Sequence, residues 1–340
     1  MKTDRVRIGI TGVGGGVGQS ILKALYDSDF DLLGMDSEYL ATGLYAAQQA
    51  RLIPYASAPN YLSTLLEICK TDNIQVLFPG LDAELQIFSA HTLDFKEIGT
   101  TVVVSKPDVI RACDDKLLTY QILTQNGLAC PLTMELNILL SAPDQLLYPI
   151  IVKQRKGGAR SANVFRIDSA ADLNRLVSSS TFRTTDYIAQ EYLSGPEFTC
   201  GTVNLDGRCM GCIVMKRILR DGDTYKAFVV KDQTIEEAVL RAVNTLKPFG
   251  ACNVQLRVVN DVPYIFEINA RCSGTTAARA LCGFNEPAAI TEYLVSGKEP
   301  RFDIRELSVL RYWQELPVEN SRIDELSNAR RITQTRKIRL

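Results

Sequence analysis

Histidine and long apolar runs are almost absent from this sequence of 340 residues. His91 is the one histidine, so the chain has almost no raw material for histidine-based catalytic triads or polyhistidine metal sites. Its longest apolar runs, such as 136–140 and 148–152, fall well short of the roughly 20 residues that a membrane helix requires. The sequence therefore predicts no membrane partner, and any chemistry must use carboxylates, amides, lysine or arginine.

An excess of charge of one sign is also missing, because 38 basic residues face 39 acidic residues and the formal net charge is −1. Without a basic field the protein has nothing to condense on a nucleic-acid backbone, so we expect a small-molecule partner and no nucleic acid. The first seven residues are charged and lead directly into a strand-like run, without the apolar segment of a secretion signal. We therefore expect a cytoplasmic protein, and a homodimer is a common state for such proteins.

Disulfide and zinc frameworks are missing although the sequence has nine cysteines. The nine are scattered and odd in number, which is typical of reduced thiols. Cys209 and Cys212 form a C-x-x-C pattern, but no second pair completes a zinc site. Both lie in an apolar alternating run, and we interpret them as core residues of a strand.

The order of apolar patterns predicts two kinds of architecture along the chain. Over the first hundred or so residues, short β-branched runs such as Arg5–Thr11 alternate with amphipathic stretches such as Val17–Tyr26, which indicates a βαβ series with a parallel sheet. After a helical stretch that ends at Asn126-Gly127, the strands come in pairs joined by turns such as Asp206-Gly207. The sequence thus predicts an α/β domain followed by an α+β body.

A glycine-rich turn lies between the first predicted strand and the first predicted helix. It contains Gly12, Gly14, Gly15, Gly16 and Gly18. A dinucleotide fold would place a pyrophosphate here, and Asp36 at the end of the second strand would hold a ribose. The same glycines also arise where a sheet and a helix approach closely. No catalytic histidine or Tyr/Lys pair stands at a dehydrogenase spacing, but an NAD(P)-binding oxidoreductase stays open as an alternative.

The polar side of a predicted hairpin near residue 260 suggests a magnesium site. Glu267 and Asn269 point to the same side of their strand because side chains alternate between its two faces. A loop of three residues, 260–262, would put Gln255 opposite Glu267, whereas a two-residue turn would separate them. A carboxylate beside amide oxygens suits Mg²⁺, which completes its octahedron with waters and nucleotide phosphates. The alternative is an ordinary solvated strand face.

Cations near two of the predicted strands suggest a phosphate site. Arg271 lies on the same side of its strand as the predicted magnesium ligands, where it would neutralise a transferring phosphoryl group. Lys153 ends an apolar strand, and a lysine at a buried strand end needs an anionic partner. The loop 155–161 combines cations with Gly157 and Gly158, whose backbone would close over phosphates. An exposed hairpin tip is the alternative for this loop.

The segment 188–197 is an apolar strand that ends on Glu191 and turns at Ser-Gly-Pro. Its backbone and Glu191 suit the edge of an adenine ring, and Glu197 suits a ribose. Taken alone, this pattern has low specificity. Arg217 and Arg220, on the next pair of strands, are candidates for binding an acid substrate, and a solvated edge fits them equally well.

Taken together and in this order, the motifs resemble those of the ATP-grasp superfamily, and most closely a single synthetase unit of the carbamoyl-phosphate synthase large subunit and related amino-acid ligases. The matching stretch runs from Asp114-Asp115-Lys116 to Arg271, with a weaker match back to residue 1. The resemblance implies a Rossmann-like pre-ATP-grasp domain at 1–112, small and large ATP-grasp subdomains that clamp ATP at 113–186 and 187–300, and a tail or small closing subdomain at 301–340.

The resemblance also implies roles for single residues. It implies ATP contacts at Lys116, Lys153, Gly157, Gly158, Ser161, Gln190, Glu191, Tyr192, Leu193 and Glu197. It implies ligands for Mg²⁺ or Mn²⁺ at Gln255, Glu267 and Asn269, and catalytic cations at Lys153 and Arg271.

The activity that the resemblance implies is that of a carboxylate–amine ligase, which forms a carbon–nitrogen bond. ATP's γ-phosphate passes to a small-molecule carboxylate, and an amine then attacks the acyl phosphate. The first domain would help to bind substrate rather than NAD. A non-catalytic ATP-binding regulator is a further alternative that the same motifs leave open.

Overall fold

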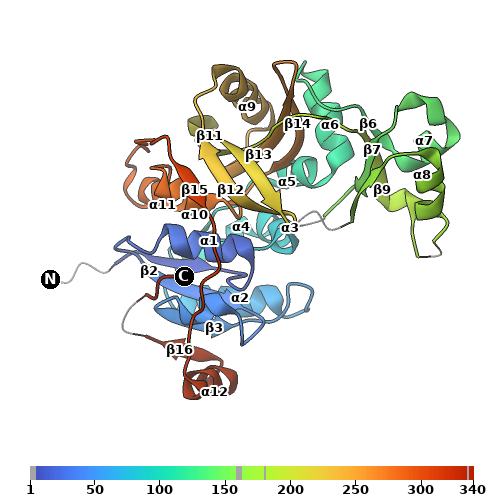
Figure 1. The fold of residues 1–340 in the computed structure, drawn as a ribbon. Coiled ribbons are helices and arrows are strands. Elements are labelled where there is room, and N and C mark those ends of the chain that lie inside the picture. Colours follow the sequence, from blue (N-terminus) through green and yellow to red (C-terminus); the bar gives the residue numbers. More distant parts are fainter. Residues whose placement is uncertain (1–4, 158–162, 180, 335–336) are drawn as a thin grey trace.

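The computed structural model describes residues 5–157, 163–179, 181–334 and 337–340, and it contains three β-sheets with helices packed around them (Figure 1). Among these residues, no helix combines the length and the apolar character that crossing a membrane would need. The first sheet belongs to the first domain, a central sheet forms most of the body, and a small sheet lies to one side (Figure 1).

The first sheet has six strands in the order β16-β3-β2-β1-β4-β5. These are β1 (Arg7–Ile10), β2 (Asp31–Asp36), β3 (Gln49–Leu52), β4 (Val76–Phe78), β5 (Thr101–Val102) and β16 (Arg331–Thr333). Its helices are α1 (Gly16–Ala24), the short 3-10 turn η1 (Thr42–Tyr45), α2 (Tyr61–Thr71), α3 (Asp82–Ala90) and α4 (Thr92–Glu97). Strands β1 to β5 run parallel, which confirms the predicted parallel sheet.

Two helices connect the first sheet to a small antiparallel sheet of order β6-β9-β7-β8. The connecting helices are α5 (Pro107–Asp114) and α6 (Lys116–Gln125). The small sheet and its covering turns comprise β6 (Thr133–Glu135), α7 (Leu136–Ser141), η2 (Pro143–Gln145), β7 (Ile150–Gln154), β8 (Val164–Ile167), α8 (Ala170–Val177), η3 (Thr184–Asp186) and β9 (Tyr187–Glu191). Because β9 pairs with both β6 and β7, this sheet extends past the boundary at residue 186 that we predicted between the two subdomains.

The central sheet is antiparallel, with the order β14-β13-β10-β11-β12-β15. It consists of β10 (Glu197–Leu205), β11 (Arg208–Arg220), β12 (Asp223–Val229), β13 (Gly250–Val259), β14 (Val262–Asn269) and β15 (Ser308–Leu310), with helices α9 (Gln233–Leu246), α10 (Thr276–Leu281) and α11 (Glu286–Ser296). Cys209 and Cys212 of β11 are half-buried against the core, as their alternating pattern predicted.

The segment after residue 300 extends over two sheets. Strand β15 pairs with β12 at the edge of the central sheet, and β16 pairs antiparallel with β3 at the edge of the first sheet. Between them lies α12 (Asn320–Ala329), whose Leu326 is fully buried. In Figure 1 this red segment runs from the body back to the blue domain. It therefore ties the two ends of the chain to one sheet.

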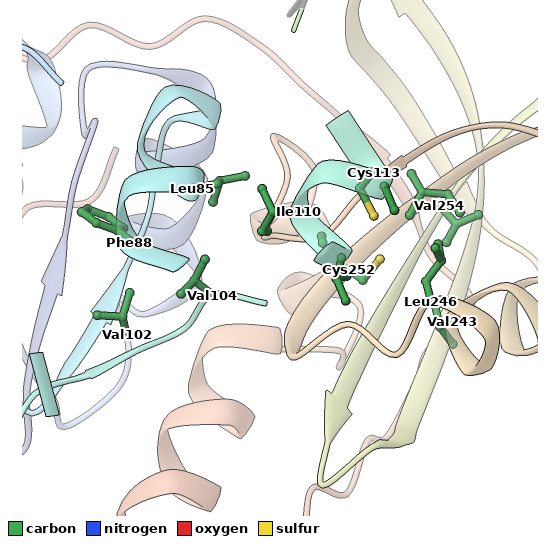
Figure 2. Packing of buried hydrophobic residues seen from close by; sticks show 14 of the residues in the cluster. Leu85, Phe88, Val102, Val104, Ile110, Cys113, Val243, Leu246, Cys252 and Val254 are labelled. Atoms are coloured by element: carbon green, nitrogen blue, oxygen red, sulfur yellow. The ribbon is translucent and has the colours of Figure 1, made fainter. Parts of the chain in front are cut away.

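One hydrophobic core is shared by the first sheet and the central sheet. Figure 2 shows side chains from α3 and from β5 and the residues just after it on one side, from α5 in between, and from α9 and β13 on the other. The labelled residues are Leu85, Phe88, Val102, Val104, Ile110, Cys113, Val243, Leu246, Cys252 and Val254. Burial of one large apolar side chain stabilises a fold by about 1.5–3 kcal/mol. This shared core therefore holds the first domain against the central sheet.

Candidate active site

The turn of the β13–β14 hairpin differs from the predicted one. Val259 pairs with Val262, so only Asn260 and Asp261 form the loop. Their φ angles of 49° and 63° are both positive, as a two-residue type I′ turn requires. The prediction of a three-residue loop is therefore wrong.

A β-bulge restores the pairing that the shorter turn would have broken. Leu256 pairs with Ile265, but the next pair is Gln255 with Glu267, so Phe266 is the additional residue in β14. The structure thus places Gln255 opposite Glu267, as we expected, by a different route. The half-buried Phe266 turns its ring towards the cleft described below.

Rows of polar side chains cross the central sheet on one face. The strand register aligns Arg217 with Glu197 and Arg257 in one row, Thr199 with Gln255 and Glu267 in the next, and Asn253 with Asn269 in the third. Members of successive rows are two residues apart along each strand, so they point to the same face. Polar residues from four strands, β10, β11, β13 and β14, therefore meet on one surface.

The three predicted metal ligands are within hydrogen-bonding distance of neighbours in this face. Gln255 Oε1 accepts a hydrogen bond from Arg217 at 2.7 Å, and Glu267 Oε1 accepts one from Asn269 Nδ2 at 3.0 Å. The second carboxylate oxygen of Glu267 accepts no hydrogen bond within the described part of the chain. No group of three His, Cys, Asp or Glu side chains suitable for a metal occurs among the described residues. One carboxylate with two amide oxygens fits Mg²⁺, which tolerates few protein ligands when phosphates supply the others.

Lys153 projects from the end of β7 into this surface. Its side chain is 5% exposed, and its Nζ donates to the carbonyl of Phe266 at 3.3 Å. Burial lowers the pKa of Lys153 to about 8, and the negative charge of Glu267 opposes that shift. A buried ammonium with one carbonyl partner is well prepared to receive a phosphate oxygen.

Arg271 extends the Glu267–Asn269 face by two residues and is paired with the first domain. Its Nε and Nη2 donate to the two carboxylate oxygens of Asp82 in α3 at 2.5 and 2.8 Å. Its Nη2 also contacts Asn269 Oδ1 at 3.3 Å, and its Nη1 donates to the carbonyl of Cys272 at 2.9 Å. The Arg271 side chain is 11% exposed, so its direction is fixed by these partners.

The start of the predicted phosphate loop is held by the turn between α5 and α6. Lys116 Nζ donates to the carbonyl of Gly157 at 2.6 Å, while the N–H of Gly157 donates to Asp114 at 2.9 Å. Asp115 accepts from Arg155 with both oxygens at 2.9 Å, and this pairing lowers the pKa of its carboxyl against the opposing effect of burial. Two loop residues in the prediction lie outside the described residues: Gly158 and Ser161.

The segment between the small and central sheets forms an apolar slot beside these polar groups. Gln190 is buried and donates to Thr133 Oγ1 at 2.8 Å, and Glu191 accepts from the N–H of Leu132 at 3.2 Å. The Tyr192 ring lies 4.6 Å from the guanidinium carbon of Arg166. Apolar side chains from both sheets complete the slot: Pro131, Ile151, Leu193, Phe266 and Ile268. Its apolar lining suits a base ring.

Glu197 is surrounded by arginines. Arg217 donates to one of its carboxylate oxygens at 2.9 and 2.5 Å, and Arg257 donates to the other at 3.1 and 2.7 Å. These four donors fill the acceptor capacity of a carboxylate, so a ribose hydroxyl could bind there only if an arginine moved. Arg220, in contrast, has a 61% exposed side chain beside Asp221 and does not line the cleft.

All predicted ATP, metal and phosphate residues in the described part of the chain line a single cleft of about 1190 Å³. They are Lys116, Lys153, Gly157, Gln190, Glu191, Tyr192, Leu193, Glu197, Gln255, Glu267, Asn269 and Arg271. The cleft joins an apolar slot, a cluster of cations and one carboxylate with amide neighbours. That arrangement can bind a base, neutralise phosphates and hold a cation at one place.

Two family models match the chain. Residues 10–103 match the PylC-like N-terminal domain, and residues 183–314 match an ATP-grasp model described as belonging to the biosynthetic pathway with Ter operon. Residues 183–314 therefore form an ATP-grasp domain. The predicted fold class, a Rossmann-like domain followed by an ATP-grasp fold, is confirmed.

Relatives and solved structures agree with this assignment. The D-alanine–D-alanine ligase of Francisella tularensis subsp. novicida (strain U112) is 26% identical over 187 residues, which are 55% of each chain. The chain thus spans about half the length of the curated relatives it matches. An L-amino acid ligase from Bacillus licheniformis superposes with a TM-score of 0.69 at 18% identity, over 90% of this chain and 79% of that one. The biotin carboxylase domain of the Hydrogenobacter thermophilus 2-oxoglutarate carboxylase, solved with MgADP, gives 0.67 at 15% identity, over 88% and 72%.

The glycine-rich turn of this ATP-grasp chain also lines the cleft, through Gly14, Gly15 and Gly16. Gly14 donates its N–H to Asp36 at 2.7 Å, so the carboxylate that a dinucleotide site would direct to a ribose instead holds the turn. A β-carbon at Gly18 would stand 2.3 Å from the carbonyl oxygen of Gly12, which forbids any larger residue. Close packing of turn and helix therefore accounts for this glycine.

Two residues of the site were not predicted from the sequence. Arg257 follows Gln255 by two positions on β13, so the same alternation would have found it. Asp82 lies 189 residues before Arg271, and no local pattern links the two. Only the packing of the first domain on the central sheet brings them together.

Proposed function

We propose that this protein is an ATP-dependent carboxylate–amine ligase that acts through an acyl phosphate. The observation that carries the proposal is the convergence of Lys153, Glu267, Asn269 and Arg271 beside an apolar slot in one cleft. The ligase names of several relatives and structural neighbours support the same class of reaction. The acid and amine are small molecules, because the site is a cleft of about 1190 Å³ rather than an extended surface.

ATP would bind with its base in the slot between the small and central sheets. The backbone of the segment 191–193 would contact the base edge, and Lys153 and Lys116 would contact the phosphates. Neutralising phosphate charge and fixing direction are the main tasks in phosphoryl transfer. Residues Gln255, Glu267 and Asn269 would hold Mg²⁺, which supplies charge stabilisation to the phosphate oxygens when bound.

The proposed reaction has two transfers. A carboxylate oxygen of the acid attacks the γ-phosphorus, the bond to the bridging oxygen breaks, and ADP leaves. The amine then attacks the acyl carbon, and inorganic phosphate leaves with the former carboxylate oxygen. Arg271 would offset the negative charge that develops in the first transfer, because its guanidinium borders the Glu267 and Asn269 face.

The test is a pairwise screen of amino acids and small carboxylates against amines, with ADP release as the readout. We expect one family of pairs to release ADP, and we expect Glu267→Gln to lower that rate by about 100-fold or more with an unchanged fold. Glu237→Gln on the exposed side of α9 is the matched control and should keep full activity. Undiminished ADP release by Glu267→Gln with the active pair would contradict the mechanism.

The same samples separate the two alternatives by melting temperature. A ligand that binds only the native state raises this temperature, so ATP with magnesium should do so and NAD should not. Stabilisation by NAD alone would favour an oxidoreductase. Stabilisation by ATP without ADP release for any pair would favour a non-catalytic regulator.

A further inference from the structure

The Arg271 side chain has little donor capacity left for a ligand. A guanidinium has five N–H groups. Two of them bind the carboxylate of Asp82, one binds Asn269 and one binds the carbonyl of Cys272. One N–H on Nη1 remains. Arg271 is thus held in a single direction, and Asp82 supplies the two shortest of its contacts.

Asp82 is itself rigidly placed at the first position of α3. The N–H of Leu81 and the hydroxyl of Thr11 both donate to Glu84, at 3.2 and 2.6 Å. The N–H of Gly80 donates to Thr11 Oγ1 at 3.1 Å. Glu84 is 1% exposed, so this network lies beneath the turn that carries Asp82.

Asp82 connects the part of the cleft that the first domain lines with the part that the central sheet lines. Its neighbours in the first domain, Gly80 and Leu81, line the cleft together with the glycine-rich turn at 14–16. Its carboxylate reaches across to the strand end that follows Glu267 and Asn269. Asp82 is therefore a direct ionic link between the first domain and the predicted phosphate site.

We propose that Asp82 is a positioning residue for phosphoryl transfer, which fixes the Arg271 guanidinium so that its remaining N–H faces the transferring group. This inference rests on the proposed ligase function. Arg271 borders the predicted metal face on one side and the first domain on the other, and only a bidentate partner fixes both the place and the plane of a guanidinium.

The charge of Asp82 gives the proposal a distinctive signature. Asp82→Asn removes a negative charge next to the phosphate site, so it should leave the KM for ATP unchanged or lower. The same change frees Arg271 to rotate, and a small misplacement of a catalytic group costs up to about 100-fold in rate. We therefore expect kcat to fall by about 10- to 100-fold while KM does not rise. A merely structural role would raise KM and lower the melting temperature instead.

The experiment measures kcat, the KM for ATP and the melting temperature for wild type, Asp82→Asn, Asp82→Glu, Arg271→Lys and the double variant Asp82→Asn with Arg271→Lys. Asp82→Glu keeps a carboxylate and should lose less kcat than Asp82→Asn. Adding Asp82→Asn to Arg271→Lys should lower kcat only slightly further, because both changes break the same interaction. Asp72→Asn is the matched control: Asp72 pairs with Arg51 in the same bidentate way, at 2.8 and 2.6 Å, away from the cleft.

The outcomes distinguish this inference from the proposed function. Wild-type ADP release reports on the ligase assignment, and its absence with every pair would overturn both. With an active wild type, an unchanged kcat in Asp82→Asn would overturn the positioning role alone. Equal losses for Asp82→Asn and Asp72→Asn, or additive losses in the double variant, would do the same.

Discussion

Lys153 is a charged side chain that is almost wholly buried. The sequence predicted it from a lysine at the end of an apolar strand, and its burial follows from that pattern. Its nearest polar partner, the carbonyl of Phe266, exists because of a bulge that no local pattern indicated. The residue could thus be found from sequence, while its surroundings could not.

The first prediction concerns the charge of Lys153. Burial lowers its pKa from 10.5 to about 8, so folding at pH 7 includes a desolvation cost of up to about 3 kcal/mol. Between pH 8 and 10.5 Lys153 holds a proton in the unfolded chain that it lacks in the folded chain. The wild-type free energy of unfolding therefore rises with pH in this range. Lys153→Met should therefore be more stable than wild type at pH 7, with a difference that shrinks towards pH 10.

Urea unfolding without ATP at pH 7 and pH 9.5 measures this difference. The same variant should lose the stabilisation by Mg-ATP that wild type shows, because a phosphate partner is gone. Ile151→Met, two residues away on the same strand, controls for side-chain packing in the unfolding measurement without ATP only, because Ile151 also lines the slot. A variant that is less stable at pH 7 and still stabilised by Mg-ATP would contradict this account.

Other single residues mark the limit of sequence reasoning. Glu267 and Asn269 share a face because of strand alternation, which is a local rule. Glu197 was assigned to a ribose, yet its carboxylate is filled by two arginines from neighbouring strands. Those partners depend on the register of three strands, which the sequence pattern did not specify.

At the scale of elements, the β13–β14 hairpin shows how two deviations compensate. The predicted loop was one residue too long, and the predicted strand lacked its bulge. Each deviation shifts the register by one, and together they restore the Gln255–Glu267 pair. A sequence pattern of alternating residues cannot distinguish a long turn from a short turn with a bulge, because both give the same final pairing.

The second prediction tests the turn. Asp261 has a φ of 63°, a region that is strained for residues with a β-carbon. Asp261→Gly gives the Asn-Gly pair that type I′ turns prefer, so we expect the free energy of unfolding to rise by about 0.5–1 kcal/mol. Urea denaturation measures the change, and the rate of ADP release should stay the same.

Asp261→Ala is the contrasting variant. Alanine keeps the β-carbon but loses the short polar side chain that eases a positive φ, so it should destabilise the protein. If the loop instead had three residues with Asp261 at a negative φ, glycine would destabilise and alanine would be neutral. The two variants therefore report on the turn type directly.

At the scale of the whole molecule, the order of the domains along the chain was predictable from sequence, but the contacts between their sheets were not. The βαβ pattern predicted the first sheet, and paired strands predicted the body. The return of the chain after residue 300 carries two short strands and the largely polar helix α12, which gave no usable sequence pattern. Its partners, β12 and β3, lie far away in sequence.

The third prediction concerns this return segment. Deletion of residues 320–340 would remove the buried side chains Leu326 and Ile332 from the first domain. At about 1.5–3 kcal/mol each, their loss should lower the free energy of unfolding by about 3–6 kcal/mol. The change should appear as a lower melting temperature by calorimetry. An equal melting temperature for the shortened chain would show that the segment only rests on the surface.

A milder variant keeps the segment and weakens its packing. Leu326→Ala should destabilise by about 2–5 kcal/mol, while Leu310→Ala, at a 63% exposed position of β15, should have little effect. This pair separates a specific packing role from a general effect of shortening the chain.

The pairing of β16 with β3 also has a consequence for synthesis on the ribosome. The first domain emerges early, yet one edge of its sheet stays open until residues 331–333 have left the exit tunnel. An open edge strand is a template for pairing with other chains. A nascent chain that pauses before residue 331 would therefore expose β3, and chaperones rather than contacts within the chain would have to cover that edge until β16 has emerged.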